Sequence, residues 1–208
     1  MLEPEVEKRP WDVQLALDDE TFRAQLAYLR ERSPFYREKL AGSPAVGLAD
    51  IARLPLTEKA ELRATVTDES PFGAHLCVQA SELARIYSTS GTTGAPSYVP
   101  LTGEDLESWI TGSARSYAAS GVAAGERIVS TYNAGPFVAG AALASFDRIG
   151  LVHVPVGTGN TERLMAAIDA LRPEAAVLTP SYAAHLVEWA AEHDSDLRGS
   201  TVERVLVA

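Results

Sequence analysis

The feature that most constrains the fold of this chain is the alternation of short apolar segments with longer helical ones after residue 126. The expected strands are Ile128–Tyr132, Leu151–Val156, Ala175–Thr179 and Val202–Val207, and the expected helices are Phe137–Ile149, Thr161–Leu171 and Tyr182–His193. Strands that alternate with helices are joined by right-handed crossovers and form a parallel sheet. The strand segments are apolar throughout, as a sheet covered by helices on both faces requires.

The first third of the sequence has a helical pattern. Apolar residues recur at three-to-four spacing in Asp18–Leu40, which Ser33 and Pro34 interrupt, and Glu58–Arg63 is a short helix with Thr57 as its expected N-cap. We therefore expect an α/β protein with a helical N-terminal region followed by a parallel sheet covered by helices. Its expected parts are a helical lead-in (1–84), a loop with flanking strands (85–101) and an α/β subdomain (102–208).

Charge and composition exclude several classes of protein. The chain has 28 Asp and Glu against 18 Lys and Arg, a net charge of -10, which disfavours binding to nucleic acid. Residues 1–10 contain no apolar signal segment, and the uncharged stretch Ile128–Phe146 contains too many polar, Gly and Pro residues for a membrane span. A single cysteine, Cys77, fits a reducing compartment. We expect a cytoplasmic protein without a membrane segment.

The segment Ser88–Ser97 is the strongest candidate for a binding site. Its first seven residues are all Ser, Thr or Gly, and no charge interrupts it. Glycines let backbone N–H groups turn inward and hydroxyls add donors, so such a loop can surround a polyphosphate. A solvated linker has a similar composition. The extended residues on both sides (Arg85–Tyr87 and Tyr98–Leu101) and the stiffening Pro96 favour the phosphate loop, although the Walker spacing is absent.

Six segments in order resemble the phenylacetate-CoA ligase branch of the adenylate-forming (acyl/aryl-CoA synthetase) superfamily. They are SPFYREKL (Ser33–Leu40), LPLTEKAELR (Leu54–Arg63), SPFG (Ser70–Gly73), STSGTTGAPSYVPLTGEDLESW (Ser88–Trp109), VPVGTGNTER (Val154–Arg163) and LTPSYAAHL (Leu178–Leu186). The resemblance covers only the N-terminal half of such a ligase. A chain that stops on the apolar strand residues Val205–Ala208 is also expected to be part of a longer protein.

The resemblance implies a two-step reaction. An aryl or arylacetic carboxylate attacks ATP in the presence of Mg2+ to give an acyl-adenylate and pyrophosphate, and coenzyme A then displaces AMP to form a thioester. The residues that would hold the β- and γ-phosphates are Ser88, Thr89, Ser90, Gly91, Thr92, Thr93 and Gly94. Ala95 stands where the family loop often has a lysine, so backbone and hydroxyl donors would carry the binding together with Mg2+.

The resemblance also places the acyl pocket at the turn after the strand that begins at Ile128. The candidate lining residues are Tyr132, Asn133, Gly135 and Phe137. An aromatic residue at each end of this turn could stack on a substrate ring. Packing in the core is the alternative for both aromatic residues. Gly157–Asn160 is a second loop at the carboxyl end of a strand and is expected to face the same cleft.

The sequence contains no candidate catalytic residue and no metal-ligand motif, and His153, in an apolar strand, is interpreted as a core histidine. In the resembled family, the ribose-binding acid, an acid that helps to hold magnesium, the interdomain hinge and the catalytic lysine lie in the C-terminal half. The chain alone is therefore expected to be inactive, with the missing half or a homodimer partner as possible partners. Two alternatives stay open: a non-catalytic orphan half or split subunit, and adenylation of a carboxylate for a biosynthetic carrier protein.

Overall fold

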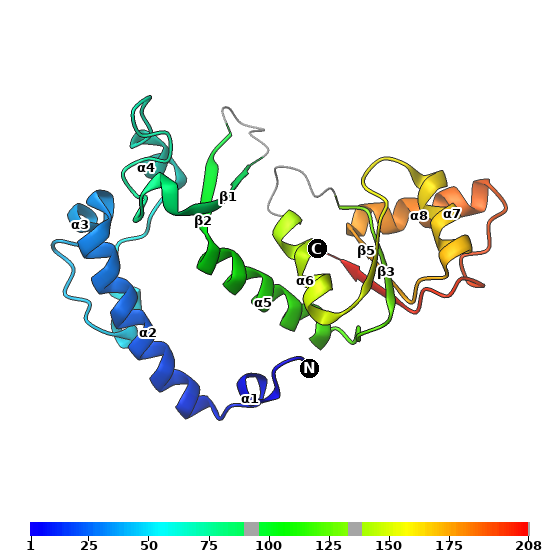
Figure 1. The fold of residues 1–208 in the computed structure, drawn as a ribbon, viewed down its shortest axis with the longest axis horizontal. Helices are drawn as coiled ribbons and strands as arrows, with labels where there is room; N and C mark the ends of the chain where they lie inside the picture. The colour runs from blue at the N-terminus through cyan, green and yellow to red at the C-terminus, as the bar shows by residue number, and fades with distance from the viewer. Residues whose placement is uncertain (90–95, 133–138, 208) are drawn as a thin grey trace. The chain divides into compact units, whose positions relative to one another are not determined.

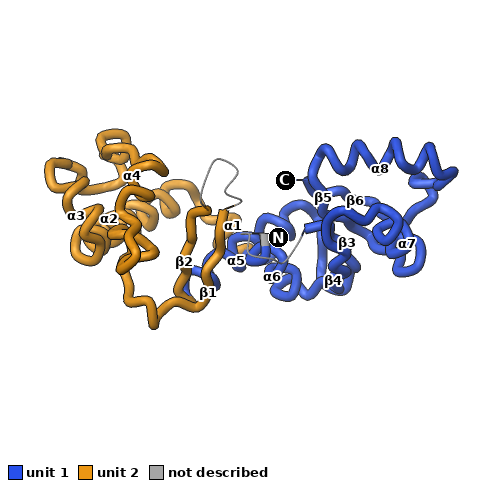
Figure 2. The backbone as a smooth tube through the Cα atoms, turned by 90° about the horizontal axis from the view of Figure 1, so that it is seen from above, with its two compact units in different colours: residues 1–3, 104–208 blue, residues 4–103 orange. Residues whose placement is uncertain are grey.

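The computed structural model describes residues 1–89, 96–132 and 139–207. These residues form two compact units, which Figure 2 shows in different colours. One unit comprises residues 4–103, and the other comprises residues 1–3 and 104–208.

The unit of residues 4–103 is mostly helical. Its helices are α1 (Pro4–Glu7), α2 (Trp11–Arg32), α3 (Pro34–Lys39) and α4 (Lys59–Ala64), with 3-10 helices η1 (Leu48–Arg53) and η2 (Ala80–Glu82). The predicted interruption at Ser33 and Pro34 is confirmed, because α2 ends at Arg32 and α3 begins at Pro34. Ser33, between the two helices, is fully buried. Its Oγ accepts a hydrogen bond from the N–H of Tyr36 (3.2 Å) and donates to the carbonyl of Ala74 (3.2 Å). One side chain thus caps α3 and anchors the segment that follows α4.

Helix α4 is present, but its predicted N-cap is wrong. The residue at the N-cap position is Glu58 and not Thr57. The N–H of Glu58 donates to Oε2 of Glu61 at 2.7 Å, and the two glutamates together form a reciprocal capping box. In a capping box, the side chain of the third helical residue accepts a hydrogen bond from the backbone N–H of the N-cap residue. Here Glu61 makes that contact with Glu58, so α4 begins one residue later than it would with Thr57 as the N-cap.

The second unit is an α/β layer structure. It contains α5 (Gly103–Ala119, whose first residue belongs to the other unit), β3 (Arg127–Ser130), α6 (Ala139–Ile149), β4 (Val152–Pro155), α7 (Thr161–Leu171), β5 (Ala175–Leu178), α8 (Pro180–Glu192) and β6 (Arg204–Val207). The four strands form one parallel sheet in the order β4-β3-β5-β6. The predicted fold class is therefore confirmed, and the strands β3 to β6 and the helices α6 to α8 lie within a few residues of their expected ranges.

The two central strands are buried on both faces. Ile128 of β3 and Val177 of β5 pack into one apolar cluster with Phe146 of α6, whereas Val129 packs into a second cluster with α7 and α8. In Figure 1, α6 accordingly lies on one side of the β3–β5 pair, and α7 and α8 lie on the other. Neighbouring residues of a strand point to opposite faces, so a strand covered on both sides needs an uninterrupted apolar sequence.

The two outer strands of the sheet are more exposed than the central pair. Val152 of β4 is 53% exposed, and Val205 and Val207 of β6 are 52% and 54% exposed. Each of these strands has one paired neighbour within the described residues, so fewer elements pack against its side chains.

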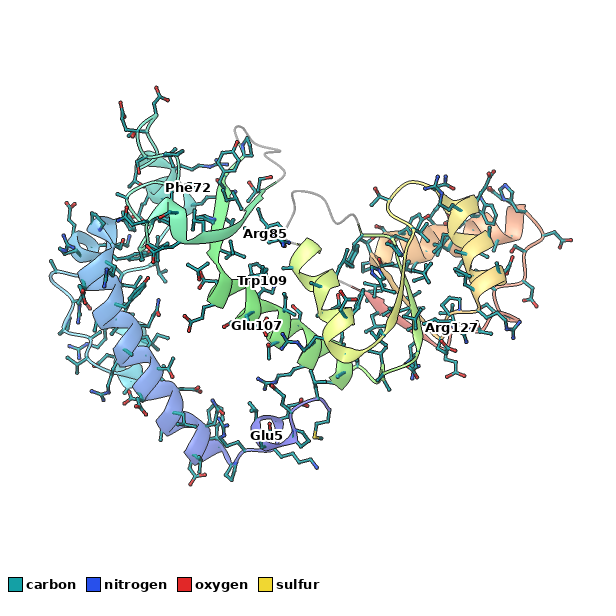
Figure 3. The ribbon with its side chains drawn as sticks, in the orientation of Figure 1. Glu5, Phe72, Arg85, Glu107, Trp109 and Arg127 are labelled. Atoms are coloured by element: carbon teal, nitrogen blue, oxygen red, sulfur yellow. The ribbon has the colours of Figure 1, made fainter. Side chains whose placement is uncertain are left out.

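An ion pair joins the starts of the central strands. Arg127, labelled in Figure 3 at the beginning of β3, contacts the carboxylate of Glu174, the residue before β5. The backbone N–H of Arg127 also donates to Oε2 of Glu174 at 2.8 Å. These hydrogen bonds, from the guanidinium first and then from the backbone, lower the pKa of Glu174 to about 2.

Phe146 is the best site for a test of this core, because its side chain is fully buried. Its ring makes edge-to-face contacts with Tyr117 (4.9 Å between centroids) and His153 (4.8 Å). We expect Phe146→Ala to lower the free energy of unfolding by about 3–5 kcal/mol, because the deleted ring leaves a cavity. The exposed Val187 of α8 gives the control: Val187→Ala should change it by less than about 0.5 kcal/mol. Equal urea midpoints for the two variants would contradict this description of the core.

Candidate functional site

The predicted phosphate loop connects two paired strands of the helical unit. Strands β1 (Leu83–Ser88) and β2 (Tyr98–Thr102) are antiparallel, with Ser88 opposite Tyr98, so both predicted extended segments are confirmed. Beyond this pair, the N–H of Thr89 donates to the carbonyl of Ser97 (2.9 Å), and the N–H of Ser97 donates to Oγ1 of Thr89 (3.0 Å). The two ends of the loop are therefore held together by reciprocal hydrogen bonds.

A positive charge lies at the exit of this loop. Nε of Arg63, on α4, donates a hydrogen bond to Oγ of Ser97 at 3.1 Å. Both side chains are partly buried. From the sequence, Arg63 was predicted only as the last residue of a short helix and of a segment that resembles the ligases, and this contact was not predicted. Because 34 residues separate Arg63 from Ser97, no local pattern of the sequence indicates it.

The predicted phosphate-binding residues are only partly within the described structure. Ser88 ends β1, and Thr89 makes the two hydrogen bonds to Ser97. The remaining candidates lie outside the described residues: Ser90, Gly91, Thr92, Thr93 and Gly94, and with them Ala95.

Of the predicted acyl-pocket residues, the structure describes Tyr132. It lies two residues after β3, at the carboxyl end of the sheet, and its hydroxyl donates to the carbonyl of Leu178 at the end of β5 (3.2 Å). Its ring is partly buried against the apolar cluster around Phe146. The contacts made by Tyr132 are thus those of a core residue at the edge where parallel sheets bind ligands. The other candidates, Asn133, Gly135 and Phe137, lie outside the described residues.

The second predicted loop also follows a strand at this edge of the sheet. Gly157 and Gly159 have positive φ angles (80° and 79°), a backbone conformation that favours glycine. Asn160 caps α7, because its Oδ1 accepts the N–H of Arg163 at 2.8 Å. The carbonyl of Ser130 at the end of β3 accepts the N–H of Val156 (3.0 Å) and so attaches the start of this loop to the sheet.

A polar cluster beside this loop was missed by the sequence analysis. Oγ1 of Thr161, the first residue of α7, lies 3.0 Å from the hydroxyl of Tyr182 and 3.4 Å from Nε2 of His185, both on α8. The available signal was topological, since α7 and α8 follow the carboxyl ends of β4 and β5, two parallel strands that flank β3 in the same sheet. The three side chains satisfy one another and join the N-terminal parts of α7 and α8.

His153 is held in the sheet by a hydrogen bond. Its Nε2 lies 2.8 Å from Oγ of the fully buried Ser130 on the neighbouring strand, and the ring of Phe146 packs against its imidazole. Burial lowers the pKa of His153, and the nearby Asp147 opposes that shift only in part. This hydrogen-bonded position accords with the interpretation of His153 as a core histidine.

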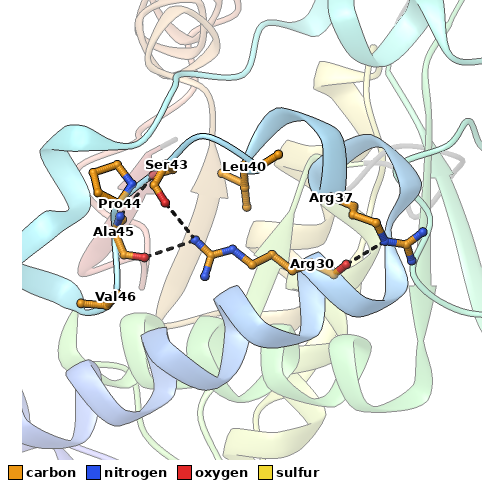
Figure 4. Close-up of a pocket in the computed structure, with 8 residues that line it drawn as sticks. Arg30, Arg37, Leu40, Ser43, Pro44, Ala45 and Val46 are labelled. Carbon is orange, nitrogen blue, oxygen red and sulfur yellow. Dashed lines mark hydrogen bonds between the residues drawn. The ribbon is translucent and has the colours of Figure 1, made fainter.

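A pocket of about 440 Å³ lies elsewhere in the helical unit (Figure 4). The guanidinium of Arg30 occupies one side and donates to the carbonyls of Ser43 (3.5 Å) and Ala45 (3.2 Å), while Arg37 donates to the carbonyl of Arg30 (3.0 Å). Arg30 thus holds the 43–46 segment against α2, and Arg37 links α3 to the last turn of α2. The pocket contains none of the predicted site residues.

The described residues contain neither a group of metal-ligating side chains nor a membrane-spanning helix. In residues 1–89, 96–132 and 139–207, no three His, Cys, Asp or Glu side chains are grouped so that they could hold a metal ion. Within the same ranges, every helix is too short or too polar to span a membrane.

Curated proteins of known function resemble this chain along most of its length. The phenylacetate-coenzyme A ligase of Thermus thermophilus is 40% identical over 194 residues, which cover 90% of this chain and 42% of that protein. The Escherichia coli protein of the same name is 31% identical over 179 residues, 83% of this chain and 40% of that protein. The chain is a homologue of part of the phenylacetate-coenzyme A ligases. It spans about two fifths of the length of these relatives, and no model of a protein family matches it.

Solved structures agree with this relationship to the ligases. A crystal structure of 2-hydroxyisobutyryl-CoA ligase in complex with 2-HIB-AMP and CoA superposes with a TM-score of 0.90 at 28% identity, covering 99% of this chain and 45% of the ligase. The same ligase in its postadenylation state gives a TM-score of 0.87 at 26% identity. The predicted resemblance to adenylate-forming CoA ligases is therefore confirmed.

The environment of His153 makes stability depend on pH. Because its pKa in the folded chain lies below the ordinary 6.5, the unfolded chain binds a proton first, and stability falls as the pH drops below about 6.5. We expect the free energy of unfolding to decrease from pH 7 to pH 5.5, and to decrease less in His153→Gln. An NMR titration of the ring protons checks the cause directly. A midpoint at or above 6.5 would contradict the buried position of the imidazole.

Proposed function

We propose that this chain binds the phosphates of ATP in the loop that begins at Ser88, as part of a ligase that converts an aryl or arylacetic acid to its coenzyme A thioester. The observation that carries the proposal is the closed base of the loop, where Thr89 and Ser97 hold together a segment of hydroxyl and glycine residues. The named activity of the homologous ligases supports it, as does the acyl-AMP named in the related crystal structures.

The chemistry of the loop fits a polyphosphate. A loop without charged side chains offers N–H and hydroxyl groups as donors, and the reciprocal bonds between Thr89 and Ser97 fix its two ends before a ligand arrives. Formation of an acyl-adenylate depends on positioning and on neutralising phosphate charge more than on a protein nucleophile. Because Ala95 supplies no cation, Mg2+ bound to the phosphates would supply part of that charge.

The acyl group is proposed to bind at the carboxyl end of β3. Tyr132, Asn133, Gly135 and Phe137 follow that strand, and the hydrogen bond from Tyr132 to Leu178 fixes one end of the segment against β5. With the tyrosine hydroxyl used in this bond, Phe137 is the aromatic side chain that we assign to the substrate ring. The carboxyl ends of parallel strands are the usual place for such a site.

We assign the remaining steps of the ligase reaction to residues that are not among these 208. The chain spans about two fifths of its relatives, and we propose that residues 1–208 form the N-terminal part of an AMP-forming synthetase domain. Its proposed parts are the lead-in (1–84), the phosphate loop with its strands (85–101) and the α/β subdomain (102–208). The CoA in the related crystal structure favours coenzyme A over a carrier protein as the acceptor.

Substitution of two loop hydroxyls tests the phosphate site. We expect Thr92→Ala combined with Thr93→Ala to raise the Kd of the 208-residue chain for Mg-ATP by about tenfold or more, since each lost hydroxyl removes a donor to a charged oxygen. Isothermal titration calorimetry provides the measurement, and Thr201→Ala, in the other unit, serves as a control that removes a hydroxyl elsewhere. Equal Kd values for the double variant and the wild type would show that the segment is a linker.

Substitution of Phe137 tests the acyl pocket. In carboxylate-dependent ATP–pyrophosphate exchange by the full-length gene product that carries these residues, Phe137→Ala should raise the KM for phenylacetate by about tenfold through loss of ring contacts. The KM for ATP should stay within about twofold, and Leu171→Ala, at an exposed position of α7, should change neither. Absence of exchange with any aryl acid in the wild type would refute the ligase proposal.

A further inference from the structure

The segment that presents Arg63 to the loop is held at both ends. At its start, the capping box between Glu58 and Glu61 fixes the first turn of α4, and the same Glu61 forms an ion pair with Lys39 of α3. At its end, Oγ1 of Thr65 donates to the carbonyl of Leu62 (2.7 Å) and accepts the N–H of Ala74 (3.1 Å). Helix α4 is therefore attached to two other segments of its unit independently of the loop.

The turn that follows α4 fits closely against it. Gly73 has a φ of 76°, and a Cβ at this position would lie 2.5 Å from Oγ1 of Thr65. Only glycine can therefore occupy this conformation at this distance from the helix. The close approach keeps the carbonyl end of α4, and with it Arg63, in a defined place.

The contact between Arg63 and Ser97 extends to both ends of the loop. Ser97 accepts from Nε of Arg63 through its side chain, and through its backbone it exchanges two hydrogen bonds with Thr89. Thr89 is the second residue of the proposed phosphate loop, and Ser97 follows it at the exit. A displacement of Ser97 would change the direction of the hydroxyl and N–H groups at both ends.

We propose that Arg63 is a positioning residue, which fixes the exit of the loop through Ser97 and so raises the affinity of the loop for a nucleoside triphosphate. The proposal rests on the proposed phosphate-binding function of the loop. A charged donor forms a stronger hydrogen bond than a neutral one, and a donor carried by an anchored helix restricts its partner. A loop whose ends are already fixed loses less conformational entropy when a ligand binds.

The first test measures the loop without nucleotide. Hydrogen exchange followed by NMR reports on the N–H groups of Thr89 and Ser97 in the 208-residue chain. We expect Arg63→Ala to speed their exchange by about tenfold, because the bonds at the loop base open more often. The matched control is Arg53→Ala, which removes a guanidinium paired with Asp50 (3.1 Å) in the same unit. Unchanged exchange in Arg63→Ala would overturn the proposal.

The second test measures the Kd for Mg-ATP by calorimetry. Arg63→Ala and Ser97→Ala should each raise it by about five- to tenfold, and the double variant should be no weaker than either single one, because both remove the same contact. Arg63→Lys should recover part of the affinity, and Arg53→Ala should match the wild type. A double variant whose losses multiply would mean that Arg63 acts on nucleotide binding by a route other than Ser97, which overturns the proposed role.

The two experiments separate this inference from the proposed function. If the wild-type chain binds Mg-ATP and Arg63→Ala binds it equally well, the positioning role is refuted while the phosphate loop stands. If the wild-type chain does not bind Mg-ATP, the proposed function fails and the inference fails with it.

Discussion

Burial of β3 and β5 on both faces is the constraint on which the α/β unit depends. Ile128 and Val129 are adjacent in sequence, yet they belong to different apolar clusters on opposite sides of the sheet. Helices are consequently required on both sides, and each chain segment must cross over between parallel strands. The carboxyl ends of the strands then meet at one edge, which is where Tyr132 and the loop at Gly157 lie.

The helical unit builds its candidate site from hydrogen bonds rather than from apolar packing. A loop of small polar residues buries little apolar surface, so its conformation must be fixed at its ends. The antiparallel pair β1–β2 brings those ends together, and Thr89, Ser97 and Arg63 secure them.

The features that depend on local sequence were predictable. The apolar periodicity predicted the strands of the sheet and the helices that cover it. Ser33 and Pro34 predicted the break between α2 and α3. Thr57 was the wrong cap because a competing glutamate side chain stands nearby. The cluster of Thr161, Tyr182 and His185 and the contact of Arg63 with Ser97 join residues 21 to 34 positions apart, and such pairs arise only from the folded topology.

Ser97 makes one contact with its backbone and a different one with its side chain. Closure of the loop uses its N–H and carbonyl, which every residue except proline offers, whereas attachment to α4 uses its hydroxyl alone. A single codon change can therefore remove this hydrogen bond to α4 and leave the backbone bonds of the hairpin intact. The strength of the attachment between α4 and the loop can therefore change at this one position without any rebuilding of the strands.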